Sequence, residues 1–135
     1  MKYLLDTNVI IDWIRGDQVV ISKITKRSQR DFALSNITIA ELWYGIHSSK
    51  TSLERLSRQL AVASVVSTFQ IIDFNQGAEE KYGEVISNLR LISKYKKKDC
   101  LDYQIASVAI LHNLTLVTRN LNDFKYISNL SITSI

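Results

Sequence analysis

One pattern recurs along this chain: a short apolar run ends at a polar residue, and apolar residues at helical spacing follow. Tyr3-Leu4-Leu5 ends at Asp6, for example, and Val9, Ile10 and Trp13 come next. Such runs, expected to be strands, lie at residues 3–5, 32–35, 69–72 and 114–118 and around Ile132. Because strands that alternate with helices form βαβ units, the sequence predicts an α/β fold with a central, mostly parallel sheet of about four to five strands flanked by helices.

Helices are expected where apolar residues recur every three or four positions. These positions are Val9, Ile10, Trp13 and Ile14; Ile39, Leu42, Trp43 and Ile46; Leu53, Leu56 and Leu60; Ala78, Tyr82, Val85, Ile86 and Leu89; and Ile105, Ala106, Ala109 and Ile110. The chain has 135 residues, 46% of them hydrophobic, which is enough for one core and leaves little for a second. No linker or internal repeat is visible, so residues 1–135 are predicted to form a single domain.

The apolar stretches are too short for a membrane protein. Charged residues interrupt each one well before the ~20 apolar residues that a membrane-spanning helix needs. The N-terminus also lacks a basic start followed by a continuous apolar segment, so we expect a soluble protein that stays in the cytoplasm. The one cysteine, Cys100, cannot form an intramolecular disulfide, and no Cys/His spacing suggests a zinc site.

Four acidic residues follow predicted strands or begin predicted helices: Asp6, Glu41, Asp102 and Asp123. The carboxyl ends of parallel strands lie at one edge of the sheet, so these side chains are expected to gather there. Carboxylates that are close together repel one another unless a cation neutralises them. Mg²⁺ is a hard cation that prefers oxygen ligands and suits phosphate chemistry. The pattern therefore indicates a divalent-cation site that acts on phosphate.

Each acid also has an ordinary structural interpretation. Asp6 could cap the helix that follows it, and Glu41 could form a capping box with Thr38. Asp102 would be favourable near the N-terminus of any helix, and Asp123 suits an Asx-type turn. These interpretations stay open for each residue taken by itself.

Residues close to these acids have expected roles of their own. Asp12 is expected to be a solvated helix residue that pairs with Arg15, three positions later. The hydroxyl groups of Thr7 and Thr118 could orient a metal ligand or a water molecule, or could make structural hydrogen bonds at the strand ends. Cys100 has no feature that marks it as a nucleophile.

Basic residues outnumber acidic ones by 17 to 13, which gives a formal net charge of +4. They concentrate in two groups: Lys23, Lys26, Arg27 and Arg30, and then Lys94 and Lys96–Lys98 with Tyr95 between them. If the acids gather in one pocket, the remaining surface is more positive still and suits a polyanion such as nucleic acid. A run of charges is also typical of a merely solvated surface.

Five segments of the sequence resemble the motifs of the PIN-domain ribonucleases, in particular the VapC-type toxins of toxin–antitoxin systems. In order, the segments are residues 3–12, 37–45, 102–107 and 114–120, and then Asp123-Phe124. The resemblance spans nearly the whole chain, so residues 1–135 are expected to be a single PIN domain with a PIN-like fold.

The resemblance implies a metal site and a function. Asp6, Glu41 and Asp102 match the acidic positions that hold the metal in the family, expected to be Mg²⁺ or Mn²⁺. Asp123 matches a fourth catalytic acid less clearly, because many members have an acid at the position of Asn120. Asp99 is a further possible ligand. The activity implied is that of a metal-dependent endoribonuclease toxin that leaves a 5′-phosphate and a 3′-hydroxyl.

The resemblance also implies partners. Arg119 and Lys96–Lys98 are expected to bind phosphates of the RNA substrate that flank the site. The family forms homodimers, and a cognate VapB-type antitoxin wraps each toxin and blocks its acidic pocket.

Three other functions stay open at the level of sequence. The first is a PIN-like module that binds RNA or protein without cutting. The second is a metal-independent ribonuclease that uses His47 and His112 as base and acid. The third is an aspartyl-phosphate enzyme built on Asp6, although no second aspartate or correctly placed lysine accompanies it.

Overall fold

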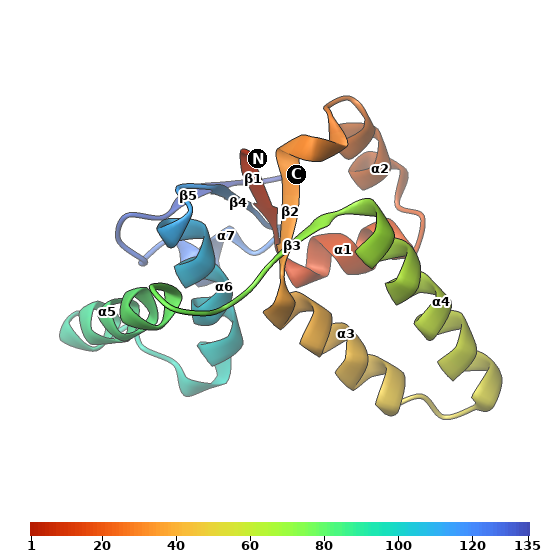
Figure 1. Cartoon of the computed structure of the whole chain (residues 1–135). Helices are drawn as coiled ribbons and strands as arrows, with labels where there is room; N and C mark the ends of the chain where they lie inside the picture. Colours follow the sequence, from red (N-terminus) through yellow and green to blue (C-terminus); the bar gives the residue numbers. More distant parts are fainter.

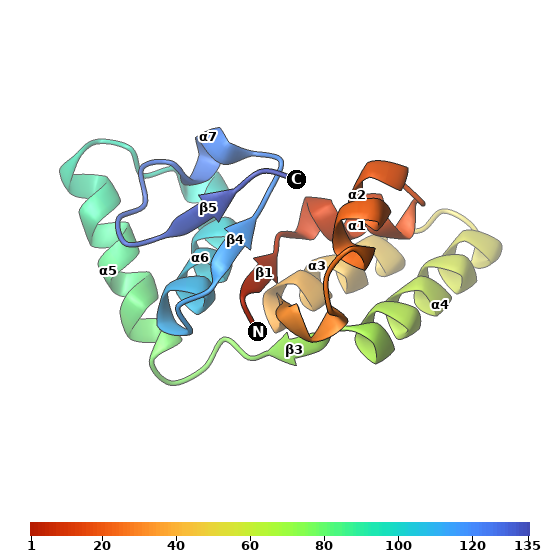
Figure 2. The same ribbon diagram turned by 90° about the horizontal axis from the view of Figure 1, so that it is seen from above.

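Five parallel strands form one sheet in the order β3-β2-β1-β4-β5. The computed structural model describes residues 1–135 (Figures 1 and 2). The strands are β1 (Tyr3–Leu5), β2 (Phe32–Ser35), β3 (Gln70–Ile72), β4 (Thr115–Val117) and β5 (Ser131–Thr133). Leu4 of the central strand pairs with Ala33 on one side and Leu116 on the other. The predicted α/β fold with a parallel sheet is therefore confirmed.

Seven helices connect and flank the strands. They are α1 (Thr7–Ile14), α2 (Gln18–Thr25), α3 (Asn36–His47), α4 (Ser52–Thr68), α5 (Ala78–Leu91), α6 (Cys100–Leu111) and α7 (Leu121–Phe124). Short 3₁₀ helices, Gln29–Asp31 and Lys97–Asp99, precede β2 and α6. Figure 1 shows the α5–α6 pair on one side of the molecule and the α3–α4 pair on the other. None of these helices is long and apolar enough to cross a membrane.

The sheet has a separate apolar core on each face. Successive residues of a strand point to opposite faces, and β1 follows this rule. Leu4 packs into the core formed with α5 and α6, whereas Leu5 packs into the core formed with α1, α2 and α4. Both leucines are fully buried. Because both faces are covered, the inner strands β1, β2 and β4 are mostly apolar, and polar side chains lie at or just beyond their ends.

Helix α2 has no counterpart in the sequence prediction. Gly16 adopts a φ of +82° directly after α1, which lets the chain turn sharply. Asp17 then caps α2 by accepting hydrogen bonds from the backbone N–H groups of Val19 and Val20 over 2.9 and 3.2 Å. The apolar run Val19-Val20-Ile21 has no clear helical period. The capping residue Asp17 was therefore the feature of the sequence that could have indicated this helix.

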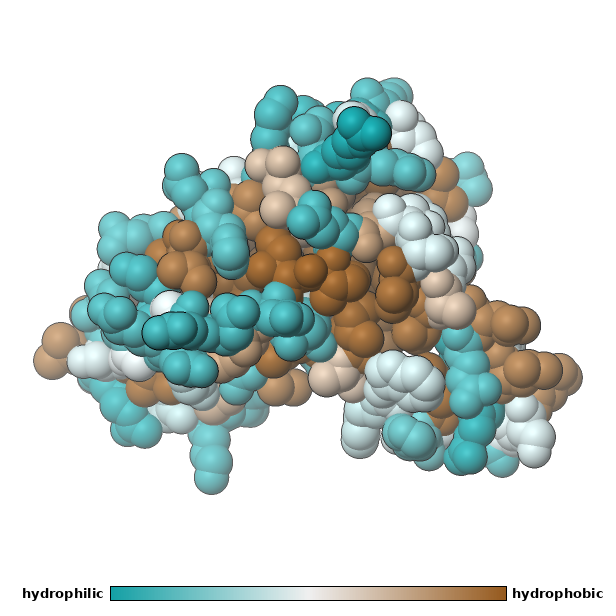
Figure 3. Space-filling model, in the orientation of Figure 1, coloured by the Kyte–Doolittle hydropathy of each residue, from teal (hydrophilic) through white to brown (hydrophobic).

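Helix α4 forms where the leucine spacing predicts it, but those leucines face away from the core. Leu53, Leu56 and Leu60 are 78%, 52% and 64% exposed, and the buried residues of α4 are Val62 and Val65. Figure 3 shows hydrophobic side chains at the outer edge of α4. The apolar period was sufficient to predict a helix and insufficient to predict which side of it is buried.

Candidate active site at the carboxyl ends of the strands

Asp6 is the buried centre of the acidic site. It follows β1 and caps α1, and its Oδ1 accepts a hydrogen bond from the backbone N–H of Thr7 over 2.8 Å. Its Oδ2 accepts a second bond, also of 2.8 Å, from the hydroxyl of Thr118, which follows β4. Asp6 is 2% exposed, and burial raises its pKa even though both hydrogen bonds act to lower it. The carboxyl group is held in one orientation by two adjacent strands.

Glu41 joins this site from α3. Helix α3 begins at Asn36 and is capped by Ser35, so Glu41 lies in its second turn. Its Oε1 accepts a 2.8 Å hydrogen bond from the hydroxyl of Thr7, and that hydroxyl lies 3.1 Å from the hydroxyl of Thr38. The capping-box interpretation of Glu41 is therefore wrong, because its side chain reaches across to α1. Burial raises its pKa, and the charge of Asp6 raises it further.

Asp102 lies in the first turn of α6, and its carboxyl group is partly buried. Burial, as the main cause, raises its pKa to about 7. Neighbouring carboxylates add to the shift in this order: Asp6, Glu41, Asp99 and Asp123. Each of these carboxylates is therefore near enough to disfavour charge on Asp102. This electrostatic coupling fits the expectation that the acids, which are far apart in sequence, meet at one edge of the sheet.

Asp123 and Asp99 lie at the rim of the cluster. Asp123 is in the short helix α7 rather than in an irregular connection, and its side chain is exposed. It raises the pKa of both Asp6 and Asp102. Asp99 ends the 3₁₀ helix before α6, half-buried. Asn120, where many family members have an acid, donates its backbone N–H to the hydroxyl of Thr118 over 3.0 Å.

The donor set fits a hard divalent cation. All of the candidate ligands are carboxylate oxygens, and three of them are wholly or partly buried with raised pKa values, so a bound cation would relieve an unfavourable concentration of negative charge. No three of these side chains are already arranged to hold a metal ion. Mg²⁺ commonly binds through one or two carboxylates and keeps several water molecules, so it does not need a closed protein cage.

The basic residues predicted to bind phosphate, Arg119 and Lys96–Lys98, differ from one another in their contacts. Arg119 makes two ion pairs, from Nε to Oδ2 of Asp12 over 2.9 Å and from Nη2 to Oδ2 of Asp17 over 3.0 Å. The predicted pairing of Asp12 with Arg15 is therefore wrong. The backbone N–H of Lys96 donates to the hydroxyl of Tyr103 over 3.0 Å. Lys97 and Lys98 are exposed in the 3₁₀ helix and make no ion pair within the chain.

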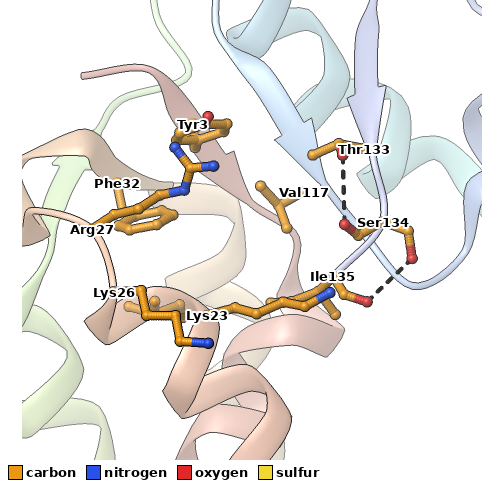
Figure 4. Close-up of a pocket in the computed structure, with 10 residues that line it drawn as sticks. Tyr3, Lys23, Lys26, Arg27, Phe32, Val117, Thr133, Ser134 and Ile135 are labelled. Atoms are coloured by element: carbon orange, nitrogen blue, oxygen red, sulfur yellow. Dashed lines mark hydrogen bonds between the residues drawn. The ribbon is translucent and has the colours of Figure 1, made fainter.

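Three residues of the first basic group, all except Arg30, line a different pocket, on the sheet face that α2 covers (Figure 4). The pocket has a volume of about 520 Å³, and the side chains of Lys23, Lys26 and Arg27 surround it. The rings of Tyr3 and Phe32 stack with centroids 5.4 Å apart, and the Arg27 guanidinium lies 5.0 Å from the Tyr3 centroid. No acid of the cluster lines this pocket.

The two other enzymatic interpretations have no matching site. His47 packs beside Trp43 within α3, whereas His112 is the exposed residue that ends α6. The Asp6 carboxylate accepts hydrogen bonds from Thr7 and Thr118 and makes no ion pair with a lysine. The sequence indicated Thr38 only as a possible capping-box partner of Glu41, whereas its hydroxyl adjoins that of Thr7 in the structure.

The chain belongs to the PIN domain family, whose model matches residues 3–130. Among curated proteins, it is 34% identical to Ribonuclease VapC2 of Rickettsia felis, with 96% of this chain and 95% of that protein covered. It is 25% identical to the tRNA(fMet)-specific endonuclease VapC of Shigella flexneri, with 96% and 95% covered.

Solved structures of related proteins share the same fold. A chain in the crystal structure of VapBC2 from Rickettsia felis, bound to a DNA fragment from their promoter, has a TM-score of 0.88 and 32% identity. A chain in the DNA-bound VapBC structure from Salmonella typhimurium has a TM-score of 0.89 and 26% identity. Each match covers 99% of this chain and 98% of the other. The resemblance seen in the sequence motifs is thereby confirmed.

Proposed function

We propose that this protein is an endoribonuclease and the toxin of a type II toxin–antitoxin pair. The observation that carries the proposal is the cluster of Asp6, Glu41 and Asp102: burial raises the pKa of all three, and the charge of Asp6 adds to the shifts of Glu41 and Asp102. The chain aligns with nearly the full length of curated VapC ribonucleases, which supports RNA as its substrate. An enzyme of this kind acts where cellular RNA is found, so we expect it to work in the cytoplasm.

We propose that Asp6, Glu41 and Asp102 hold Mg²⁺, with Mn²⁺ as a substitute. When bound, such an ion polarises a phosphate and lowers the pKa of a coordinated water molecule. The chain's own contribution is to orient the carboxylates: Thr118 and the Thr7 backbone fix Asp6, and the Thr7 hydroxyl fixes Glu41. We propose that Asp123, exposed at the rim, orients a water molecule.

The surface of the protein supports a role for partner proteins. A groove of about 360 Å³ between α1, α3 and α4 is lined by apolar residues such as Ile11, Ile14 and Leu42, and Glu41 is at its edge. A VapB-type antitoxin segment in this groove would reach the acidic site. Trp43 and Tyr44 are 41% and 76% exposed on α3, which supports the proposed homodimer. The named structural relatives are VapBC complexes.

The test is RNA cleavage by purified protein that is free of any copurifying inhibitor. Total cellular RNA is incubated with wild type in Mg²⁺ or Mn²⁺, beside Asp6→Asn, Asp102→Asn and wild type in EDTA. We expect discrete fragments with wild type and none with either variant or in EDTA. A matched control is Asp73→Asn, which removes an acid that follows β3 and lies outside the cluster. Cutting that survives all three treatments would rule out the acidic site.

The second candidate is a PIN-like module that binds RNA or protein without cutting, and Asn120 is the departure from the family that favours it. This candidate predicts no cleavage by inhibitor-free wild type. It also predicts that Asp6→Asn leaves the biological effect of the protein unchanged. The same set of variants therefore separates the two functions.

A further inference from the structure

A second pocket lies beside the acidic site. It has a volume of about 450 Å³. Its walls come from α5, from the segment before α6, and from α7 and the residues after it. Its charged and aromatic lining residues are Lys94, Tyr95, Lys96, Asp99, Tyr103, Asp123, Lys125 and Tyr126. Two of these residues, Asp99 and Asp123, are also the residues at the rim of the acidic cluster. The pocket therefore adjoins the acidic cluster, unlike the pocket around Lys23.

Two lysines in this pocket converge on one tyrosine. The Nζ atom of Lys94 lies 4.6 Å from the ring centroid of Tyr126, and that of Lys125 lies 5.1 Å from it. Neither ammonium group makes an ion pair with a carboxylate. The charges of Lys125 and Lys94 lower the pKa of the Tyr126 hydroxyl, as expected where cations gather around one ring. Both ammonium groups lie beside the same ring, so an anion bound there would be attracted to both charges.

The backbone holds these three residues in place. Ser93 has a φ of +58°, and Lys94 after it donates its N–H to the carbonyl of Leu89 over 2.8 Å, which fixes the turn at the end of α5. On the other wall, the buried side chains of Phe124 and Ile127 anchor the segment that carries Lys125 and Tyr126. Tyr126 itself is 43% exposed. The cations are thus presented on ordered backbone and their ends remain accessible.

We propose that Lys94, Lys125 and the Tyr126 hydroxyl bind a backbone phosphate of the RNA strand, adjacent to the phosphate that is cut. This inference rests on the proposed ribonuclease function. Lysine ammonium groups and a tyrosine hydroxyl are donors suited to phosphate oxygens, and lysines interleaved with aromatic rings are typical of single-stranded nucleic-acid grooves. Tyr95, whose ring is covered by Arg90 at 4.1 Å, belongs to the same surface.

The test measures binding without cutting. A short single-stranded oligoribonucleotide labelled with fluorescein is titrated with full-length protein in EDTA, and anisotropy gives Kd at several salt concentrations. The variant Lys94→Gln/Lys125→Gln is compared with Lys23→Gln/Lys26→Gln, which removes the same charge from the other basic pocket. We expect about 5- to 20-fold weaker binding for the first pair, and a salt slope lower by about 0.7 because the variant neutralises one phosphate fewer. The control pair should stay within about twofold of wild type.

A hydroxyl-specific variant and cleavage kinetics complete the test. Tyr126→Phe keeps the ring and should weaken binding about 2- to 5-fold, because the hydrogen bond from its hydroxyl to phosphate is removed. In Mg²⁺, the Lys94/Lys125 variant should raise KM with kcat nearly unchanged, as expected for groups that position the substrate.

Two outcomes would overturn the inference. Equal weakening by both lysine pairs would show only an effect of net charge. Unchanged RNA binding, with loss of binding to an acidic peptide, would assign the pocket to a protein partner. Failure of the ribonuclease function would be seen separately, as RNA binding through Lys94 and Lys125 without any cleavage.

Discussion

The hydroxyl of Thr118 donates a 2.8 Å hydrogen bond to Oδ2 of Asp6, although the two residues are 112 positions apart in sequence. Both are buried, and each directly follows a central strand of the sheet, β4 and β1. The backbone N–H of Asp6 also donates to the carbonyl of Val117 over 3.0 Å. The parallel pairing of these strands therefore places the donor beside the carboxylate, and the site depends on the register of the sheet.

Replacing Thr118 with valine should damage the site while keeping the shape of the side chain. The change leaves a buried carboxylate oxygen without its donor, so we expect a loss of about 1–3 kcal/mol in the free energy of unfolding. Because this hydrogen bond lowers the pKa of Asp6, its loss should also move the acidic limb of the pH–activity profile to higher pH. Urea denaturation and initial rates measure the two effects. Thr133→Val, at an exposed position of β5, is the control and should change neither.

Asp102→Asn should make the metal-free protein more stable at neutral and alkaline pH. The folded state raises the pKa of Asp102 from 3.8 to about 7, so between these values the folded state holds a proton that the unfolded state has released. The contribution of Asp102 to the stability of wild type therefore falls as pH rises from about 4 to 7, and its full penalty is present above pH 7. Asparagine cannot ionise, so the variant does not have this penalty.

After allowance for the solvent exposure of Asp102, this penalty should be about 1–2 kcal/mol, or roughly 3–8 °C in Tm. Thermal melts in EDTA at pH 8 and near pH 4 measure it, and the difference between variant and wild type should vanish at the lower pH. A variant less stable than wild type at pH 8 would contradict the electrostatic account.

Wild-type protein should bind Mg²⁺ more tightly as pH rises towards 7. Metal binding requires the ionised carboxylate, and Asp102 releases its proton with a pKa of about 7 in the metal-free state. The apparent affinity should increase up to about tenfold per pH unit below 7 and level off above it. Calorimetric titration at several pH values, in buffers of different ionisation enthalpy, also counts the protons released. An affinity that does not depend on pH would exclude Asp102 as a ligand.

The sequence predicted the features of this protein that follow from the pattern of residues within short segments and from the order of those segments. The strands at Tyr3–Leu5 and Phe32–Ser35 lie where the apolar runs predict them, because both faces of the sheet are covered and such runs must be apolar. The gathering of Asp6, Glu41 and Asp102 was also predictable, since it follows from the parallel topology.

Contacts between distant segments were not predictable. Asp12 pairs with Arg119 rather than with Arg15, because the end of β4 brings the guanidinium to α1 and α2. The lysines around Tyr126 come from segments about 30 residues apart, and only the fold unites them. The exposure of Leu53 on α4 likewise depends on which side of the helix faces the sheet.

Arg119 provides the last prediction, because it is expected to bind RNA and also makes two ion pairs within the chain. If its main role is to join α1 to α2, then Arg119→Gln should lower the free energy of unfolding by up to about 1 kcal/mol, since the pairs are partly exposed to solvent. Its effect should be strongly reduced in Asp12→Asn/Asp17→Asn, where the partners are already absent.

A double-mutant cycle from urea denaturation at low and high salt measures this coupling, which should shrink at high salt. The RNA affinity of the same variants decides between the two roles. If Arg119→Gln weakens RNA binding tenfold in the Asp12→Asn/Asp17→Asn background, Arg119 contacts the substrate and the original expectation is correct. If binding there is unchanged, its function is to hold α2 against the edge of the acidic site.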